Sequence, residues 1–202
     1  AKNDLKEIPS EFGELTRLKS VNLMKAYELE TIPPEIGNLQ NLTFLRLDLS
    51  SLKVLPKEIG KLKNLRILNI SNTKIVSLPD EIGDLENLEF LDLHSNGIAS
   101  IPESICNLTK LKALDIGQTN LETLPKDIGN LTELVRLDLF GCQLKTLPSS
   151  AKNLKQLRYL NVFDNFGLDE GYKKWFSDSV YTCTDDPEND AGWRSKWFYH
   201  KP

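Results

Sequence analysis

The sequence contains few of the residue types from which catalytic and metal sites are built. Its 202 residues include two histidines, His94 and His200, and three cysteines, Cys106, Cys142 and Cys183. It has no nucleophile elbow, phosphate-binding glycine loop, dinucleotide fingerprint or metal-ligand cluster. These absences predict a non-enzymatic protein with no catalytic residues, no bound metal and no cofactor.

The sequence also lacks an excess of basic residues and a long hydrophobic run. Its formal net charge is −4, with 25 Lys and Arg against 29 Asp and Glu. Nothing in this balance attracts nucleic acid or an anionic membrane surface. No apolar stretch approaches the ~18 residues that a transmembrane helix needs, so we predict neither nucleic-acid binding nor membrane insertion.

What the sequence does contain is a repeat. Prolines recur every 23 or 24 residues, and a fixed period in this range is the signature of a solenoid. The clearest unit is LPDEIGDLENLEFLDLHSNGIASI, residues 78–101. The repeating prolines are Pro9, Pro33, Pro56, Pro79, Pro102, Pro125 and Pro148.

Each unit changes its hydrophobic spacing along its length. Leu91-Asp-Leu93 alternates with period two and predicts a very short strand with both leucines facing inward. Apolar residues then recur at every third position, at Ile82, Leu85 and Leu88, and this spacing suits a tight, partly 3₁₀ helical turn. Pro79 suits the first position of that turn, because it has no N–H to lose. Gly83 marks either a close approach of backbone or a positive φ.

The pattern LxxLxLxxNxL followed by LPxxIGxL resembles the leucine-rich repeat proteins of the short, 23-residue class. That class includes Ras-group and Scribble-type repeats and plant intracellular or disease-resistance-type repeats. The resemblance covers residues 3–168 and implies an α/β horseshoe solenoid that binds proteins. Its parallel β-sheet would lie on the concave face and its short helical or 3₁₀ turns on the convex face. We therefore expect about seven coils of 23–24 residues over 1–168 and an aromatic-rich C-terminal cap or tail over 169–202.

The compartment is predicted from the cysteines. Their number is odd, and the paired-cysteine caps usual in extracellular members of the family are missing, which favours a cytoplasmic location. Three N-glycosylation sequons leave a secreted location open. They carry little weight, because the consensus GNLT of the family's repeat itself contains the sequon. They begin at Asn41, Asn107 and Asn130.

Both ends of the sequence depart from the repeat. Residues 3–9 match the middle of a unit, but no strand precedes them. This suggests that upstream residues were removed and that the chain is a fragment of a larger protein. If it is not a fragment, we expect it to be a monomer. Eleven of the sixteen aromatic residues lie between Tyr159 and Tyr199. A short helix over 169–177 and the aromatics Trp175, Phe176, Trp193, Trp197 and Phe198 would cap the last coil or form a docking surface. The acidic loop 185–190 is more simply a solvated loop than a calcium site.

Two loop features follow from the repeat alignment. One extra residue at 25–29 should bulge the loop after the first strand and push Tyr27 outward. The position where the family prefers Asn is always small and able to hydrogen-bond, so it should satisfy backbone groups between coils. It is filled by Ser50, Thr73, Asn96, Thr119, Cys142 and Asn165. Cys142 is therefore structural, and we expect Cys106 to be inert.

The candidate binding surface is the row of side chains beside the inward leucines. Asp92, Asp115 and Asp138 share one register on adjacent strands, about 5 Å apart, which is unfavourable unless a partner supplies cations. Alternatively, these carboxylates are simply solvated. His94 should be a contact or solvated residue. The predicted partner-binding residues are Phe44, Arg46, Ile67, Phe90, Asp92, His94, Asp115, Arg136, Asp138, Phe140, Tyr159 and Phe163.

We predict a non-enzymatic protein–protein interaction module that binds a protein or peptide through its concave face. Large apolar groups on that face, beside the acidic row, suit a partner with basic residues flanking an apolar anchor. Two alternatives remain. The chain could be the recognition part of a larger signalling protein, immune receptor or ubiquitin ligase, or a structural subunit of a large assembly.

Overall fold

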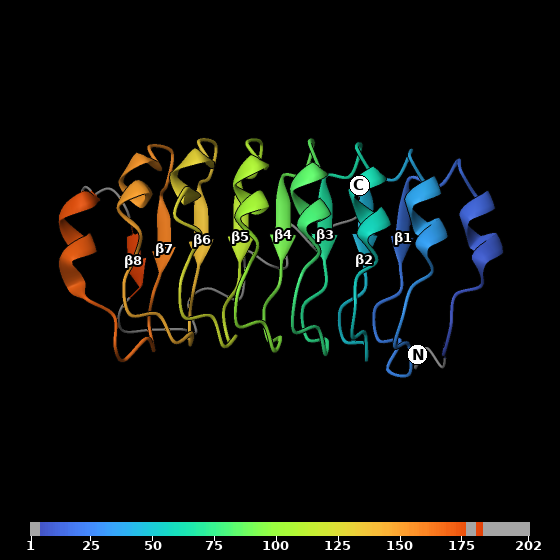
Figure 1. Cartoon of the computed structure of the whole chain (residues 1–202), viewed down its shortest axis with the longest axis horizontal. Helices are drawn as coiled ribbons and strands as arrows, with labels where there is room; N and C mark the ends of the chain where they lie inside the picture. The colour runs from blue at the N-terminus through green and yellow to red at the C-terminus, as the bar shows by residue number, and fades with distance from the viewer. Residues whose placement is uncertain (1–4, 177–180, 184–202) are drawn as a thin grey trace.

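The computed structural model describes residues 5–176 and 181–183 as one solenoid (Figure 1). Eight parallel strands form a single sheet in sequence order. They are β1 (Ser20–Asn22), β2 (Phe44–Arg46), β3 (Ile67–Asn69), β4 (Phe90–Asp92), β5 (Ala113–Asp115), β6 (Arg136–Asp138), β7 (Tyr159–Asn161) and β8 (Tyr181–Cys183). The 3₁₀ helices are η1 (Ser10–Glu14), η2 (Pro34–Asn38), η3 (Lys57–Lys61), η4 (Asp80–Asp84), η5 (Glu103–Asn107), η6 (Ile128–Asn130), η7 (Ser149–Asn153) and η8 (Glu170–Trp175).

The leucines of the repeat explain this arrangement. The central residue of each strand from β1 to β7 is a buried aliphatic, and one continuous hydrophobic core runs from Ile8 to Tyr172. The row of 3₁₀ helices extends further along the long axis than the row of strands (Figure 1). The sheet therefore lies on the concave side, as predicted. Strand β4 begins one residue before the predicted Leu91, because Phe90 N–H already donates to Arg66 O at 3.0 Å.

The position of the repeating proline differs by one residue from the prediction. Pro79 has φ −70° and ψ 151°, so its backbone is extended and it precedes η4 as the N-cap. Its carbonyl accepts the first helical hydrogen bond, from Ile82 N–H at 3.0 Å. The prediction that Pro79 occupies the first helical position is therefore wrong.

The helix glycines are required by close packing of coils. A Cβ on Gly83 would lie 2.2 Å from the carbonyl oxygen of Ser104 in the next coil. Of the two predicted roles, close approach is thus confirmed at Gly83. Positive φ occurs instead at one loop position of each coil, which the sequence did not reveal. These residues are Lys25, Leu49, Asn72, Ser95, Gln118, Gly141 and Asp164.

A polar ladder joins the coils behind the strands, as predicted. Asn96 Nδ2 donates to Ile70 O at 2.9 Å and to Leu93 O at 2.7 Å. Its Oδ1 accepts from the backbone N–H of Thr73 at 3.1 Å and from the Thr73 hydroxyl at 2.6 Å. Cys142 continues the ladder, because its Sγ donates to Ile116 O at 3.4 Å. The thiol of Cys142 is therefore structural.

The first-coil insertion behaves as predicted, since Tyr27 points outward and is 48% exposed. At the other end, η8 begins after Asp169, whose carboxylate caps it by accepting Gly171 N–H at 2.7 Å. Tyr172 is buried, and Trp175 and Phe176 pack against the core, so this helix covers the last leucines. Strand β8 extends the sheet beyond residue 168.

Three predictions concern residues that lie wholly or partly outside the described part of the chain. They are the unmatched first residues, the acidic loop 185–190, and the aromatics Trp193, Trp197 and Phe198 of the predicted cap.

Candidate functional site

All twelve predicted partner-binding residues lie on one side of the sheet, here called the strand face. Strand side chains alternate between faces, so the first and third residue of each strand point away from the leucine core. The residue two positions after each strand continues the same row. Strands β2 to β7 contribute Phe44, Arg46, Ile67, Phe90, Asp92, His94, Asp115, Arg136, Asp138, Phe140, Tyr159 and Phe163.

The acidic row is the most regular feature of the strand face. Asp92 pairs with Asp115, and Asp115 pairs with Asp138, on neighbouring strands. This confirms the predicted register. The three residues are only 2%, 0% and 3% exposed, so the alternative that they are simply solvated is wrong.

Each carboxylate of the row accepts one local backbone hydrogen bond. Asp92 Oδ1 accepts His94 N–H at 3.1 Å, and Asp115 Oδ1 accepts Gly117 N–H at 2.9 Å. Asp138 Oδ1 accepts the corresponding bond, from the amide two residues later, at 3.1 Å. Asparagines at the same register make the same bond, namely Asn22, Asn69 and Asn161. The bond therefore requires an oxygen and not a charge.

An apolar cluster lies beside the acidic row on the same face. Phe90 and Ala113 are buried against each other, and Ile67 packs on them from the neighbouring strand. Phe44, on β2, is also buried. Phe44 and Phe90 are therefore large apolar groups of this face that are buried and not exposed to water. Ile67 is partly buried.

Two arginines flank the central strands. Arg46 forms a buried bidentate ion pair with Asp48, with Nη2–Oδ2 at 2.9 Å. The Arg136 guanidinium lies over the Tyr159 ring, 3.4 Å from its centroid, and 3.4 Å from an Asp138 oxygen. Burial lowers the pKa of Arg136 from its ordinary value. Arg46 lies on β2 and Arg136 lies on β6, so the two arginines stand on either side of the apolar cluster.

His94 and Cys106 lie in different surroundings. His94 Nδ1 lies 3.6 Å from Asp115 Oδ1, which makes it a contact residue of the acidic row. Burial, followed by the charges of Glu103 and Asp127, raises the pKa of Cys106 to about 11, so its thiolate is scarce at neutral pH. Among residues 5–176 and 181–183, no three His, Cys, Asp or Glu side chains group as metal ligands.

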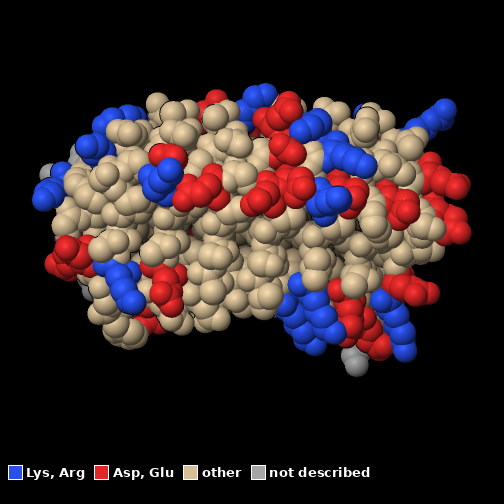
Figure 2. All heavy atoms as spheres, viewed as in Figure 1, with Lys and Arg blue, Asp and Glu red and all other residues tan. Residues whose placement is uncertain are grey.

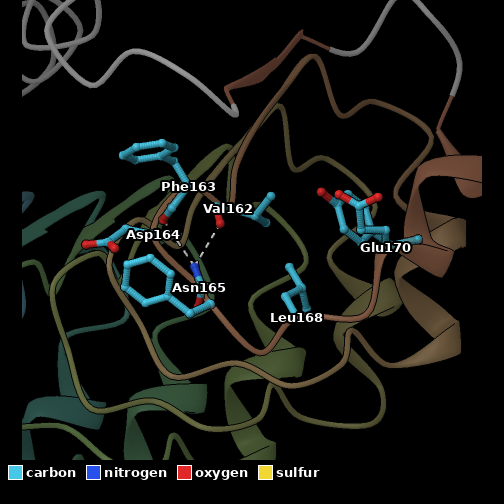
Figure 3. Close-up of a pocket in the computed structure, with 8 residues that line it drawn as sticks. Val162, Phe163, Asp164, Asn165, Leu168 and Glu170 are labelled. Carbon is cyan, nitrogen blue, oxygen red and sulfur yellow. Dashed lines mark hydrogen bonds between the residues drawn. The ribbon is translucent and has the colours of Figure 1, made fainter.

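Aromatic side chains gather at the last coils. The rings of Phe140 and Phe163 stack at a centroid distance of 6.0 Å. Beside them is a pocket of about 310 Å³, where Glu170 and Leu168 lie across from Asp164 and Phe163 (Figure 3). Phe166, in the lining, is 99% exposed. Phe166 was not among the residues predicted from the sequence to bind a partner, although the end of the regular repeat near it was visible in the sequence. The lining offers apolar contact, the two carboxylates of Asp164 and Glu170, and Tyr172.

The opposite side of the solenoid looks different. Figure 2 shows acidic and basic side chains interspersed along the helices. Lys57 and Lys61 of η3 line one surface pocket together with Glu81 and Asp84 of η4. Charges of both signs cancel on this side, whereas the acidic row concentrates one sign.

Comparison with known proteins identifies relatives. The family model described as "Leucine-rich repeat region" matches residues 55–121 and 105–177. Solved structures with the same fold include a leucine-rich repeat protein of Leptospira interrogans (34% identity, TM-score 0.65, covering 82% of this chain and 51% of that one). No curated protein matches.

Two further structures come from different settings. The ectodomain of the Arabidopsis thaliana membrane receptor kinase GASSHO1/SCHENGEN3, solved with CASPARIAN STRIP INTEGRITY FACTOR 2, is 31% identical with a TM-score of 0.73. The match covers 89% of this chain and 22% of the receptor. The leucine-rich repeat domain of the type III effector XopL is 26% identical, with a TM-score of 0.74, covering 89% and 73%.

The chain thus spans about half of the Leptospira protein and about a fifth of the plant receptor ectodomain. Across the part of the chain that the structure describes, every helix is too short or too polar to cross a membrane.

Proposed function

The chain belongs to the leucine-rich repeat proteins, because the family model matches more than half of the chain. From this we propose that it is a non-enzymatic module that binds a protein or peptide on its strand face. The partner carries basic residues next to an apolar anchor. Binding requires neither a metal nor a cofactor, and the module works in the cytoplasm.

The observation that carries this proposal is that three carboxylates in one register lie beside an apolar cluster on the strand face. Asn69 and Asn161 make the local backbone bond as well as Asp92, Asp115 and Asp138 do. Three like charges in one register on adjacent strands are unfavourable by themselves. A partner with basic residues is attracted to carboxylates arranged in this way, and it also associates faster.

The apolar cluster supplies the second half of the recognition surface. Phe90 and Asp92 stand on the same strand and the same face, two residues apart. Aromatic anchors in well-packed positions provide most of the affinity in many interfaces, while charges mainly set orientation and rate. The rigid stack of coils holds both features in place before binding, which reduces the ordering cost.

The relatives support this function at the level of the family. One of the similar receptor ectodomains was solved in complex with a partner factor. The chain matches only a fraction of the length of that ectodomain and of the Leptospira protein. This favours a second candidate function, in which the module is the recognition part of a longer signalling protein. Both candidates use the strand face in the same way.

A peptide-display experiment tests the proposal. Random dodecapeptides are selected on the immobilised full chain, and selected peptides are then titrated by fluorescence anisotropy. The test variant combines Asp92→Asn, Asp115→Asn and Asp138→Asn, and we call it the triple-Asn variant. It keeps an oxygen for each local backbone hydrogen bond and removes the negative charges, including the one that pairs with Arg136. We expect basic, aromatic peptides whose affinity falls by about tenfold or more.

A matched control removes three negative charges from the other side of the solenoid. It combines Asp80→Asn, Glu81→Gln and Asp84→Asn on η4. We expect this control to bind the selected peptides like the wild type. Equal affinities for the wild type and the triple-Asn variant would contradict the proposal.

A further inference from the structure

We propose that the solenoid has a second docking surface, at the edge of the sheet where the strands begin, and that this surface binds an acidic polypeptide segment. Both the place and the chemistry of the partner differ from those of the strand face, so the inference goes beyond the proposed function. We call this surface the strand-start edge. It consists of the segments that run from each 3₁₀ helix to the following strand, namely 15–19, 39–43, 62–66, 85–89, 108–112, 131–135 and 154–158.

Basic residues occur in every second segment of the strand-start edge. The segments before β1, β3, β5 and β7 each contain two basic residues and no acidic one. The segments before β2, β4 and β6 contain no basic residue. The four basic pairs are Arg17 and Lys19, Lys63 and Arg66, Lys110 and Lys112, and Lys155 and Arg158. Lys112 is partly buried and the other seven are exposed, so the edge presents a regular positive pattern to solvent.

A backbone ladder fixes the spacing of the basic pairs. The residue directly before each strand donates its N–H to the carbonyl of the corresponding residue in the preceding coil. Arg66 N–H donates to Thr43 O at 2.9 Å, and Glu89 N–H donates to Arg66 O at 2.8 Å. Lys112 N–H continues the ladder by donating to Glu89 O at 2.8 Å. Neighbouring segments are therefore about as close as neighbouring strands, ~4.8 Å, and successive basic pairs lie about 10 Å apart.

Ion pairing within the edge uses only part of this positive charge. Glu89 pairs with Arg66 Nε at 2.6 Å and with Lys112 Nζ at 2.9 Å. At the equivalent positions between the other basic pairs, the chain has the uncharged residues Thr43 and Val135. The seven segments contain eight basic residues against three acidic ones, which are Glu86, Glu89 and Glu133. The excess of exposed cations attracts a partner of negative charge.

A hollow in the surface lies beside the first two basic pairs. Its volume is about 430 Å³, and its lining includes Lys19 and Arg66 together with Asn41 and Asn64. Asn64 Nδ2 donates to Gln40 O at 2.8 Å, which holds this part of the wall in place. The hollow thus combines neutral amide groups with two cations. It can receive the uncharged residues of a peptide between two acidic anchors.

The spacing of the basic pairs matches an extended acidic peptide. Each residue of an extended strand advances about 3.3 Å, so every third residue advances about 10 Å. A peptide with an acidic residue at every third position places one carboxylate opposite each basic pair. Its other residues then face the segments before β2, β4 and β6. A uniform polyanion such as single-stranded DNA fits less well, because its phosphates would also meet Glu86, Glu89 and Glu133.

The first test compares two acidic decapeptides of equal composition, titrated with the full chain by fluorescence anisotropy. The spaced peptide, DSTDSTDSTD, has aspartate at every third position, and the block peptide, STSDDDDTST, has its aspartates together. The acidic block spans about 10 Å and reaches at most two basic pairs. The spaced peptide should bind about fivefold or more tightly at low salt, since one additional exposed ion pair contributes up to about that factor. Equal affinities, or no binding of the spaced peptide, would overturn the proposal.

The second test removes charge from the strand-start edge. The edge variant combines Lys19→Gln, Lys155→Gln and Arg158→Gln, and it keeps both ion pairs of Glu89. It removes one basic pair completely and half of another. The spaced peptide should therefore bind the edge variant about tenfold more weakly than the wild type. An unchanged affinity would contradict docking at this edge.

A matched control removes three positive charges from the helices. It combines Lys57→Gln and Lys61→Gln on η3 with Lys152→Gln on η7. The net charge changes by the same amount as in the edge variant, so a general attraction between protein and peptide weakens equally in both. We expect the control to bind the spaced peptide like the wild type. Equal losses of affinity in the two variants would refute a site at the strand-start edge.

Two further measurements identify the partner class and separate this surface from the strand face. Pentathymidylate has four phosphodiester charges, as many as the spaced peptide has aspartates, and it should bind more weakly; tighter binding would overturn the assignment to a polypeptide. The triple-Asn variant should bind the spaced peptide at least as tightly as the wild type does. The display-selected basic peptides should not displace the spaced peptide from the wild type. Displacement would refute a separate site, whereas failure to select any basic peptide would affect the proposed function alone.

Discussion

Replacing Asn96 by alanine tests whether the polar ladder holds neighbouring coils together. The Asn96 side chain is buried and makes hydrogen bonds to backbone groups of its own coil and of the preceding one. After truncation, Ile70 O keeps the hydroxyl of Thr73 as a donor at 3.2 Å. Thr73 N–H and Leu93 O lose the partner that Asn96 supplied.

The magnitude follows from these two backbone groups. Each buried polar group left unsatisfied costs about 1–3 kcal/mol. Asn96→Ala should therefore lower the free energy of unfolding by about 2–6 kcal/mol. Asn96→Thr should recover a large part of the loss, because Thr119 at the same register donates its hydroxyl to Ile116 O at 2.8 Å.

The assay is equilibrium unfolding in urea, followed by circular dichroism and tryptophan fluorescence. The control is Asn64→Ala, which removes an exposed asparagine that donates to Gln40 O at 2.8 Å. Water replaces that bond, so the loss should stay below about 1 kcal/mol. If Asn96→Ala and Asn64→Ala destabilise equally, the ladder does not carry the stacking energy that we assign to it.

Three further predictions follow. Gly83→Ala should destabilise by about 2–3 kcal/mol in urea, because its Cβ meets backbone at 2.2 Å; Gly97→Ala, facing a side-chain carbon at 3.1 Å, should change stability less. The Arg66 hydrogen bond lowers the pKa of Glu89, so Glu89→Gln should cost below about 1 kcal/mol at pH 7. The difference should shrink as the pH falls through that lowered pKa, below the ordinary range of a glutamate; a constant difference would contradict this. Cys106 should resist iodoacetamide at pH 8 in native protein and react in urea, by peptide-resolved mass spectrometry; equal labelling would refute its inertness.

The sequence predicted those features that depend on the period of the repeat. Leu91, Ile82 and Gly83 have positions fixed by core packing, and each coil repeats the same solution. The register of Asp92 with Asp115 followed directly, because strands of equal spacing must align. The hydrogen bond from the amide of His94 to Asp92 could also have been predicted from the sequence, because aspartate and asparagine side chains commonly accept from the amide two residues later.

Other features depend on contacts that no single unit encodes. Leu49 and Gln118 adopt positive φ although their side chains disfavour it; the stacked coils impose that conformation. Burial of Phe90 depends on Ala113 and Ile67, which belong to neighbouring coils. Strand β8 carries no leucine that marks it. The pocket at Phe166 arises where the repeat ends, so periodicity gave no guide to it.

Hydrogen-exchange mass spectrometry of the full chain, with and without a display-selected peptide, tests the central claim most directly. We predict slower exchange in peptides covering 88–96, 111–119 and 134–142, which contain the acidic row, and no change in peptides of η4. Protection confined to η4 and its neighbouring helices, or to the pocket at 162–172, would contradict binding on the strand face.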